Sequence, residues 1–102
     1  MNMNNLMKQA QQMQKRMLDI QEELATRTVE ATVGGGMVTA VVNGQQELMS
    51  LTISPDVVDP DDIEMLEDLI VAAVNEARHQ AQELMTQEMS KLTGGVKIPG
   101  LM

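Results

Sequence analysis

The sequence contains no cysteine, tryptophan, tyrosine or phenylalanine. The absence of cysteine excludes disulfides, thiolate metal sites and cysteine nucleophiles. The absence of aromatic rings excludes the stacking of bases or sugars by which proteins commonly bind single strands and RNA loops. Apolar packing must therefore rely on aliphatic side chains, among them 11 methionines, whose flexible thioethers adapt to irregular surfaces.

Long apolar runs are also missing. No stretch approaches the roughly 20 apolar residues of a membrane-spanning helix, and the polar first residues do not form a secretory signal. We therefore expect no membrane association and a reducing cytoplasm as the compartment. The 102 residues amount to one small domain with a modest core.

Basic residues are scarce and unevenly distributed. The chain has 15 acidic and 7 basic residues, and its net charge of -8 taken alone argues against nucleic-acid binding. Two stretches without acids, residues 1–18 and 89–102, nevertheless hold five of the basic residues: Lys8, Lys15, Arg16, Lys91 and Lys97. The acids concentrate between residues 56 and 68. Both ends are thus mildly basic around an acidic middle.

Residues 3–24 carry apolar side chains at alternating spacings of three and four, which only a helix places on one stripe. The stripe consists of Met3, Leu6, Ala10, Met13, Met17, Ile20 and Leu24. It fills the a and d positions of three heptads, and the rest of the segment is polar. We predict a helix over residues 4–26 whose stripe packs either on a second helix of the same chain or on another subunit. So much apolar surface on a short chain favours the subunit interface.

Three segments with strand character follow, at residues 28–33, 37–42 and 47–54. Three glycines separate the first from the second. The last two place apolar sets on one face: Val38, Ala40 and Val42, then Met49, Leu51 and Ile53. The dipeptide Asn43-Gly44 predicts a type I′ hairpin turn with positive φ at both central positions. The segments predict a three-stranded antiparallel meander.

A second helix is predicted to run to about residue 92. Asp59 is expected as its N-cap and Pro60 as its first helical residue, with acids in the first turn. Its apolar stripe is Ile63, Leu66, Ile70, Ala73, Ala77 and Leu84. Gly94-Gly95 is expected to cap its end, before a flexible tail at residues 96–102. The order predicts a single α+β domain over residues 1–102 with the pattern α-β-β-β-α.

No enzymatic or metal site can be assembled from these residues. His79, the only histidine, lies in mid-helix without a nucleophile to activate, so a solvated position is the better interpretation. The acids of residues 56–64 lack the central glycine of a calcium loop, and helix capping accounts for them. The glycines of residues 34–36 lack the lysine of a phosphate loop. We expect neither catalysis nor a cofactor.

The basic residues admit two interpretations. They are either ordinary solvated surface or a site for phosphates. If the two helices pack antiparallel, both acid-free stretches meet at one end of the molecule, and the acids crowd the opposite end. Doubled in a two-fold dimer, such a set could neutralise several phosphates of duplex DNA. Contacts of this kind carry little sequence information.

Several short segments, spread over nearly the whole chain, together form a specific pattern when they are taken in order. They are the methionine- and glutamine-rich residues 4–15, the glycine turn with residues 38–44, the strand exit Ile53-Ser54-Pro55, residues 66–77, residues 89–95 and Pro99-Gly100-Leu101. In this order they resemble the YbaB/EbfC family of small bacterial nucleoid-associated DNA-binding proteins.

The resemblance implies a homodimer shaped like tweezers, with the sheets as its body and the long helices as its arms, which binds double-stranded DNA in the nucleoid. Contacts attributed to the long helices of the family fall on this chain at Lys8, Lys15, Arg16, Arg78 and Lys91, with Lys97 in the tail. Lys15 and Arg16 are the strongest candidates because they are adjacent on an acid-free stretch. Lys8 lies one heptad before Lys15 and shares its face.

A second hypothesis is a protein-interaction adaptor or scaffold that does not bind DNA. Methionine-rich helix faces repack around diverse partners, so the long helices would recruit another protein. An adaptor would capture a defined protein and ignore DNA at moderate salt.

Overall fold

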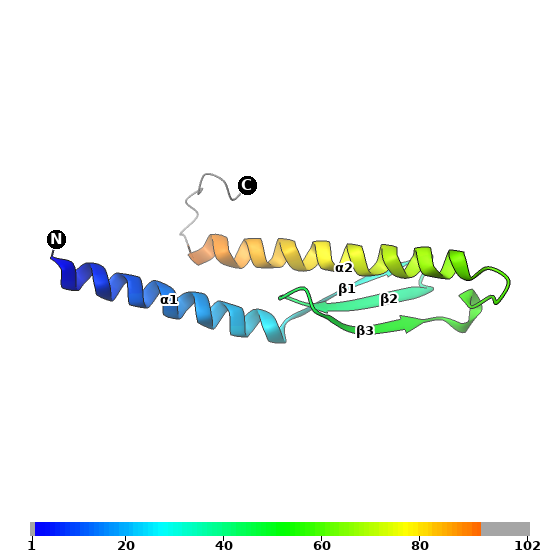
Figure 1. The fold of residues 1–102 in the computed structure, drawn as a ribbon, viewed down its shortest axis with the longest axis horizontal. Helices are drawn as coiled ribbons and strands as arrows, with labels where there is room; N and C mark the ends of the chain where they lie inside the picture. Colours follow the sequence, from blue (N-terminus) through cyan, green and yellow to red (C-terminus); the bar gives the residue numbers. More distant parts are fainter. Residues whose placement is uncertain (1, 93–102) are drawn as a thin grey trace.

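The computed structural model describes residues 2–92. Figure 1 shows a long helix, a three-stranded sheet and a second long helix. The elements are α1 (Met3–Thr26), β1 (Thr28–Val33), β2 (Val38–Asn43), β3 (Leu48–Ile53), the 3-10 helix η1 (Pro55–Val57) and α2 (Ile63–Leu92). This order confirms the predicted pattern α-β-β-β-α. The predicted cap at Gly94-Gly95, the tail and Lys97 lie outside the described residues.

The sheet is an antiparallel meander in the order β1-β2-β3. Val33 pairs with Val38 across the first hairpin, and Val38 pairs with Ile53 across the second. The first turn contains Gly34, Gly35 and Gly36 at φ values of 65°, 67° and 96°. Side chains rarely adopt this left-handed region, so the turn needs glycine.

The second turn differs from the predicted type I′ geometry. Gly44 does not have a positive φ, and Gln46, at 66°, is the one non-glycine residue among residues 2–92 that does. Gly44 instead lies against the last turn of α1, where its N–H donates to the carbonyls of Leu24 at 2.8 Å and Arg27 at 2.9 Å. A Cβ at Gly44 would lie 2.6 Å from the Leu24 oxygen. The contact with α1, rather than hairpin geometry, therefore requires this glycine.

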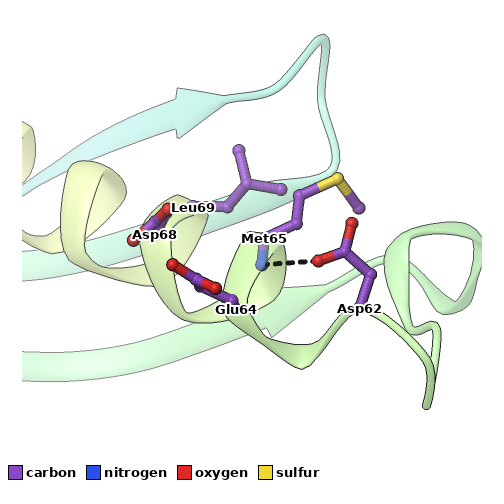
Figure 2. A pocket seen from close by; sticks show the side chains of 5 residues that line it. All are labelled: Asp62, Glu64, Met65, Asp68 and Leu69. Carbon is purple, nitrogen blue, oxygen red and sulfur yellow. Dashed lines mark hydrogen bonds between the residues drawn. The ribbon is translucent and has the colours of Figure 1, made fainter.

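The start of α2 also differs from the prediction. The helix begins at Ile63, and the Asp62 carboxylate accepts the N–H of Met65 at 3.2 Å, which is the bond of an N-cap (Figure 2). Asp59 closes a turn in front of the helix, because its carbonyl accepts the N–H of Asp62 at 2.9 Å. Asp59 is therefore not the cap, and Pro60 belongs to the turn.

The core lies between α2 and one face of the sheet, over β1 and β2 (Figure 1). On α2 the side chains of Ala73, Ala77 and Ala81 are fully buried. On the sheet the fully buried side chains are the predicted face of β2: Val38, Ala40 and Val42. Alanines spaced by four residues let the helix approach the sheet closely. Of the α1 stripe, only Leu24 is buried.

The molecule is a rod with extents of 70 × 25 × 17 Å. Its radius of gyration is 19.2 Å, whereas a compact chain of this length would have about 13 Å. Much of the length comes from α1, which projects beyond the sheet as an arm (Figure 1). The two long helices run in opposite directions, which is the condition for both acid-free stretches to meet at one end (Figure 1). Within residues 2–92, no helix is apolar over a length that would cross a bilayer.

Candidate nucleic-acid interface

The projecting arm of α1 has basic residues on one side and an apolar stripe on the opposite side. A helix turns by about 100° per residue, which places Lys8 and Lys15 on the side opposite the stripe of Leu6, Met13 and Met17. Every residue from 2 to 19 is exposed. The cations are therefore accessible on one side of the arm, while the other side presents methionine and leucine to the solvent.

Arg16 lies between these two sides. It lines a shallow hollow on α1 together with Gln9, Gln12 and Met13. A guanidinium offers five N–H donors in a fixed fork, and the glutamine amides add further donors. This combination suits the oxygens of a phosphate group.

The three cations of the arm are not neutralised by neighbouring acids. Within residues 2–92, no carboxylate lies within the salt-bridge distance of 4.0 Å from Lys8, Lys15 or Arg16. Asp19 is the first acid in the chain and lies one turn beyond Lys15. The outer part of α1 thus carries three cations that no carboxylate within residues 2–92 compensates.

Lys91 is placed differently, because it is ion-paired. Its Nζ lies 3.1 Å from Oε1 of Glu88, and the same oxygen accepts a hydrogen bond from Nη1 of Arg27 at 2.9 Å. These bonds, that from Lys91 foremost, hold the pKa of the Glu88 carboxyl below its usual range. The charge of Lys91 is therefore partly compensated, although the end of α2 points to the same end of the molecule as the arm of α1 (Figure 1).

Sequence reasoning missed the structural role of Arg27. This residue caps α1 and connects it to α2 through Glu88, which lies 61 positions away in the chain. It also lies 3.8 Å from Glu23 on its own helix. No local pattern could reveal a contact of this sequence separation.

Arg78 is not brought to the basic end. It is exposed on α2 between Ala77 and Ala81, which are buried in the core with the sheet, about 20 Å along the helix from Lys91 at 1.5 Å per residue. The structure therefore brings Lys8, Lys15 and Arg16 together on one arm, places Lys91 near that end and leaves Arg78 apart.

The densest group of acids, at residues 56–68, lies at the other end of the molecule. Figure 2 shows a hollow at the start of α2 with carboxylates around it, lined by Asp62, Glu64, Met65, Asp68 and Leu69. No group of three potential ligands within residues 2–92 could hold a metal ion. This end repels phosphates and keeps its negative charge away from the arm.

His79 occupies the solvated helix position that was expected. Its Nε2 lies 3.1 Å from Oε1 of Glu83, one turn further along α2, and both side chains are more than 60% exposed. An exposed pair of this kind is an ordinary helix-surface interaction.

Known proteins share both the sequence and the fold. The model of the YbaB/EbfC DNA-binding family matches residues 1–96. A nucleoid-associated protein from Thermoanaerobacter pseudethanolicus is 61% identical over 100 residues, which cover 98% of this chain and 90% of the relative. One from Acetivibrio thermocellus is 59% identical over 101 residues, with coverages of 98% and 89%.

A solved structure, the crystal structure of an uncharacterised protein from Helicobacter pylori, has the same fold. It superposes with a TM-score of 0.82 at 23% identity and covers 92% of this chain and 99% of its own. At this identity the likeness concerns the fold alone, and the assignment rests on the family model and the curated relatives. The chain belongs to the YbaB/EbfC DNA-binding family.

Proposed function

We propose that this protein is a nucleoid-associated protein that binds double-stranded DNA as a homodimer, chiefly through phosphates and without catalysis. The observation that carries the proposal is the acid-free arm of α1, on which Lys8, Lys15 and Arg16 are exposed and unpaired within the described residues. Membership of a DNA-binding family supports the same conclusion.

Uncovered apolar surface supports the homodimer. On α1, Met3, Leu6, Met13 and Met17 are between 37% and 77% exposed. On β3, Leu48, Met49 and Leu51 are between 36% and 56% exposed. Exposed apolar surface on both elements is typical of an interaction site, and a second copy of the chain would cover it.

A dimer would also carry enough positive charge to bind DNA, although one chain has few free cations. One arm carries three free cations, and two arms carry six. About six phosphate contacts give salt-sensitive binding to duplex DNA. Because these contacts are to the backbone, they position the protein and specify little sequence. The acidic end of the molecule lies at the far end of the rod, where repulsion of the DNA is weakest.

Light scattering with and without duplex DNA tests the proposal. The free protein is expected at twice the chain mass of 11.2 kDa, and the mixture is expected to contain a heavier complex that dissociates as salt is added. A dimer that leaves the DNA free at low salt would contradict the proposed function.

The exposed methionine side of α1 also supports a second candidate, the adaptor that recruits a protein partner. A pull-down from a bacterial lysate treated with nuclease separates the two candidates. An adaptor would retain one defined protein after nuclease treatment, whereas a DNA-binding protein would lose the material that it carried through DNA.

A further inference from the structure

The apolar stripe of α1 loses its cover along the length of the helix. Near the sheet, Leu24 is 2% exposed and Ile20 is half-buried. Further out, the exposed fraction of the side chain rises to 37% at Met17, 45% at Met13 and 77% at Met3. These residues share one face of the helix, so the face that packs inward at Leu24 continues outward as bare apolar surface.

The helix α2 covers this face only as far as its own end. The two helices contact each other, and the apolar side chains in the last turns of α2, Met85, Met89 and Leu92, are half-buried. The arm of α1 extends past the end of α2 (Figure 1). Because the helices run in opposite directions, a chain that continues past Leu92 in the direction of α2 runs along the arm toward Met3.

The sequence after Leu92 is long enough to cover the arm. Ten residues follow Leu92, and all of them lie outside the described residues. An extended chain spans about 3.3 Å per residue, so ten residues reach about 33 Å. The distance along α1 from Met17 to Met3 is about 21 Å at 1.5 Å per residue. The tail, residues 96–102, can therefore lie along the whole uncovered part of the stripe.

The sequence of the tail suits an extended segment with one apolar face. Gly94-Gly95 permits a change of direction after the helix. Pro99 interrupts helices and favours extended backbone at the residue before it, Ile98. In an extended segment Val96 and Ile98 share one face, and Lys97 lies on the other. One face of the tail is thus apolar and the other is basic.

We propose that the tail of the same chain docks in an extended form on the outer part of the α1 stripe, over Leu6 and Met13. Val96 and Ile98 then face the stripe, and Lys97 faces the solvent. The docked tail occupies the apolar side of the arm, so the basic side stays accessible and the docking does not rest on DNA binding. The exposed strand β3 then remains for a second copy to cover.

The tail fits this face better than a separate partner does. Its attachment to α2 holds it near the arm at an effective concentration of about a millimolar, which a separate partner would have to outcompete. The last ten residues contain no acid, so docking does not neutralise the cations of the arm. Lys97 is separated from those cations by the helix itself, whose diameter is about 10 Å. Exposed like charges at this distance are largely screened at physiological salt.

Pairs of cysteines test the docking, because the parent protein has no cysteine. Ile98→Cys is combined with Leu6→Cys in one variant and with Met13→Cys in another. Mild oxidation is expected to give an intrachain disulfide in at least one of them, detected by mass spectrometry as the loss of the thiol hydrogens from a single chain. The matched control combines Ile98→Cys with Gln11→Cys, which lies between the two stripe positions but on the opposite side of the helix. It is expected to form the intrachain disulfide at least about tenfold more slowly.

Oxidation of methionine by hydrogen peroxide gives an independent readout, because a covered thioether reacts more slowly than an exposed one. The triple-serine variant Val96→Ser, Ile98→Ser, Leu101→Ser keeps the length of the tail and removes its apolar face. Met13 is expected to be oxidised at least about threefold faster in this variant than in the parent protein. Met49 on β3 is the internal reference and is expected to react at the same rate in both. Circular dichroism checks that the helices are retained.

Three results would overturn the docking. The first is an equal rate of intrachain disulfide formation in the stripe pairs and in the control pair. The second is a disulfide between chains, in a mixture of the single variants Met13→Cys and Ile98→Cys, that forms faster than the intrachain one, since it would assign the stripe to a second copy. The third is an unchanged oxidation rate of Met13 in the triple-serine variant.

Discussion

At the scale of single residues, α1 carries exposed cations on one side and an exposed apolar stripe on the other. Lys8 and Lys15 lie a heptad apart on the exposed side away from the stripe, and Arg16 adds a guanidinium with five donors. None of the three is held by a carboxylate within residues 2–92. Free cations cost little to bring to a phosphate, because no existing ion pair has to be broken.

Replacing these three cations by alanine tests the site. In the triple variant Lys8→Ala, Lys15→Ala, Arg16→Ala we expect weaker DNA binding and a flatter salt dependence, since about six counterion-releasing contacts are lost per dimer. A mobility-shift series at several salt concentrations measures both. The matched control replaces the neutral Asn4, Gln11 and Gln14 of the same arm by alanine, and it is expected to bind DNA with the affinity of the parent protein. Equal affinity of the triple variant would refute the assignment.

Gly44 is a second residue whose role is specific. A Cβ there would lie 2.6 Å from the Leu24 oxygen and 2.8 Å from the Leu24 Cβ. We expect Gly44→Ala to lower the free energy of unfolding by about 2–3 kcal/mol through overpacking. Gly35→Ala, where a Cβ meets nothing within 4 Å but φ is 67°, should cost about 1 kcal/mol. Urea unfolding compares the two, and a larger loss at Gly35 would contradict this account.

At the scale of elements, the junction of the two helices depends on Glu88. This carboxylate accepts from both Lys91 and Arg27, which ties the last turn of α2 to the end of α1. The two cations hold its pKa below the usual range in the folded protein. The ionised carboxylate therefore stabilises the folded state at neutral pH, and that contribution is lost as the pH falls through the folded-state pKa.

Glu88→Gln should accordingly be less stable than the parent protein at pH 7, and the difference should vanish at strongly acidic pH, where both side chains are uncharged. Thermal unfolding followed by circular dichroism at a series of pH values measures this. The control Glu83→Gln removes an exposed carboxylate that pairs only with His79 and should change little. A stability difference for Glu88→Gln that persisted at low pH would show that charge is not the cause.

The elements themselves were predictable, and their junctions were not. The spacing of Met13 and Met17, and the alternation of Val38 with Ala40, are local patterns that identify a helix and a strand. The role of Gly44 was predicted wrongly: this position needs glycine because α1 lies so close, and not because of the hairpin turn. The α2 cap was placed at Asp59 because Pro60 follows it and proline favours the first helical position. Three aspartates precede the helix, and only the fold decides which of them caps it. Contacts between distant elements leave no periodic signal in the sequence.

The candidate site was predictable to the extent that it is local. Lys15 and Arg16 lie on an acid-free helix segment, which the sequence displays directly. The partial neutralisation of Lys91 is local as well, because Glu88 lies three residues before it on the same helix. The second contact of Glu88, with Arg27 of α1, could not be predicted because it joins distant parts of the chain. The separation of Arg78 from the basic end depends on where α2 crosses the sheet.

At the scale of the whole molecule, the protein binds a polyanion although its net charge is -8. A negative net charge and DNA binding are compatible because the molecule is 70 Å long, so that charges at its two ends lie far apart. Exposed charges further apart than about 8 Å are largely screened at physiological salt. The acids at the start of α2 therefore have little effect on a phosphate held at the outer part of α1.

The salt dependence of DNA affinity tests this account most directly. Fluorescence anisotropy of a labelled duplex, titrated with the parent protein between 50 and 200 mM salt, gives the logarithm of the binding constant against that of the salt concentration. Six phosphate contacts predict a straight line with a slope of about −5. A slope near zero, with affinity retained at high salt, would contradict binding through the exposed cations of α1.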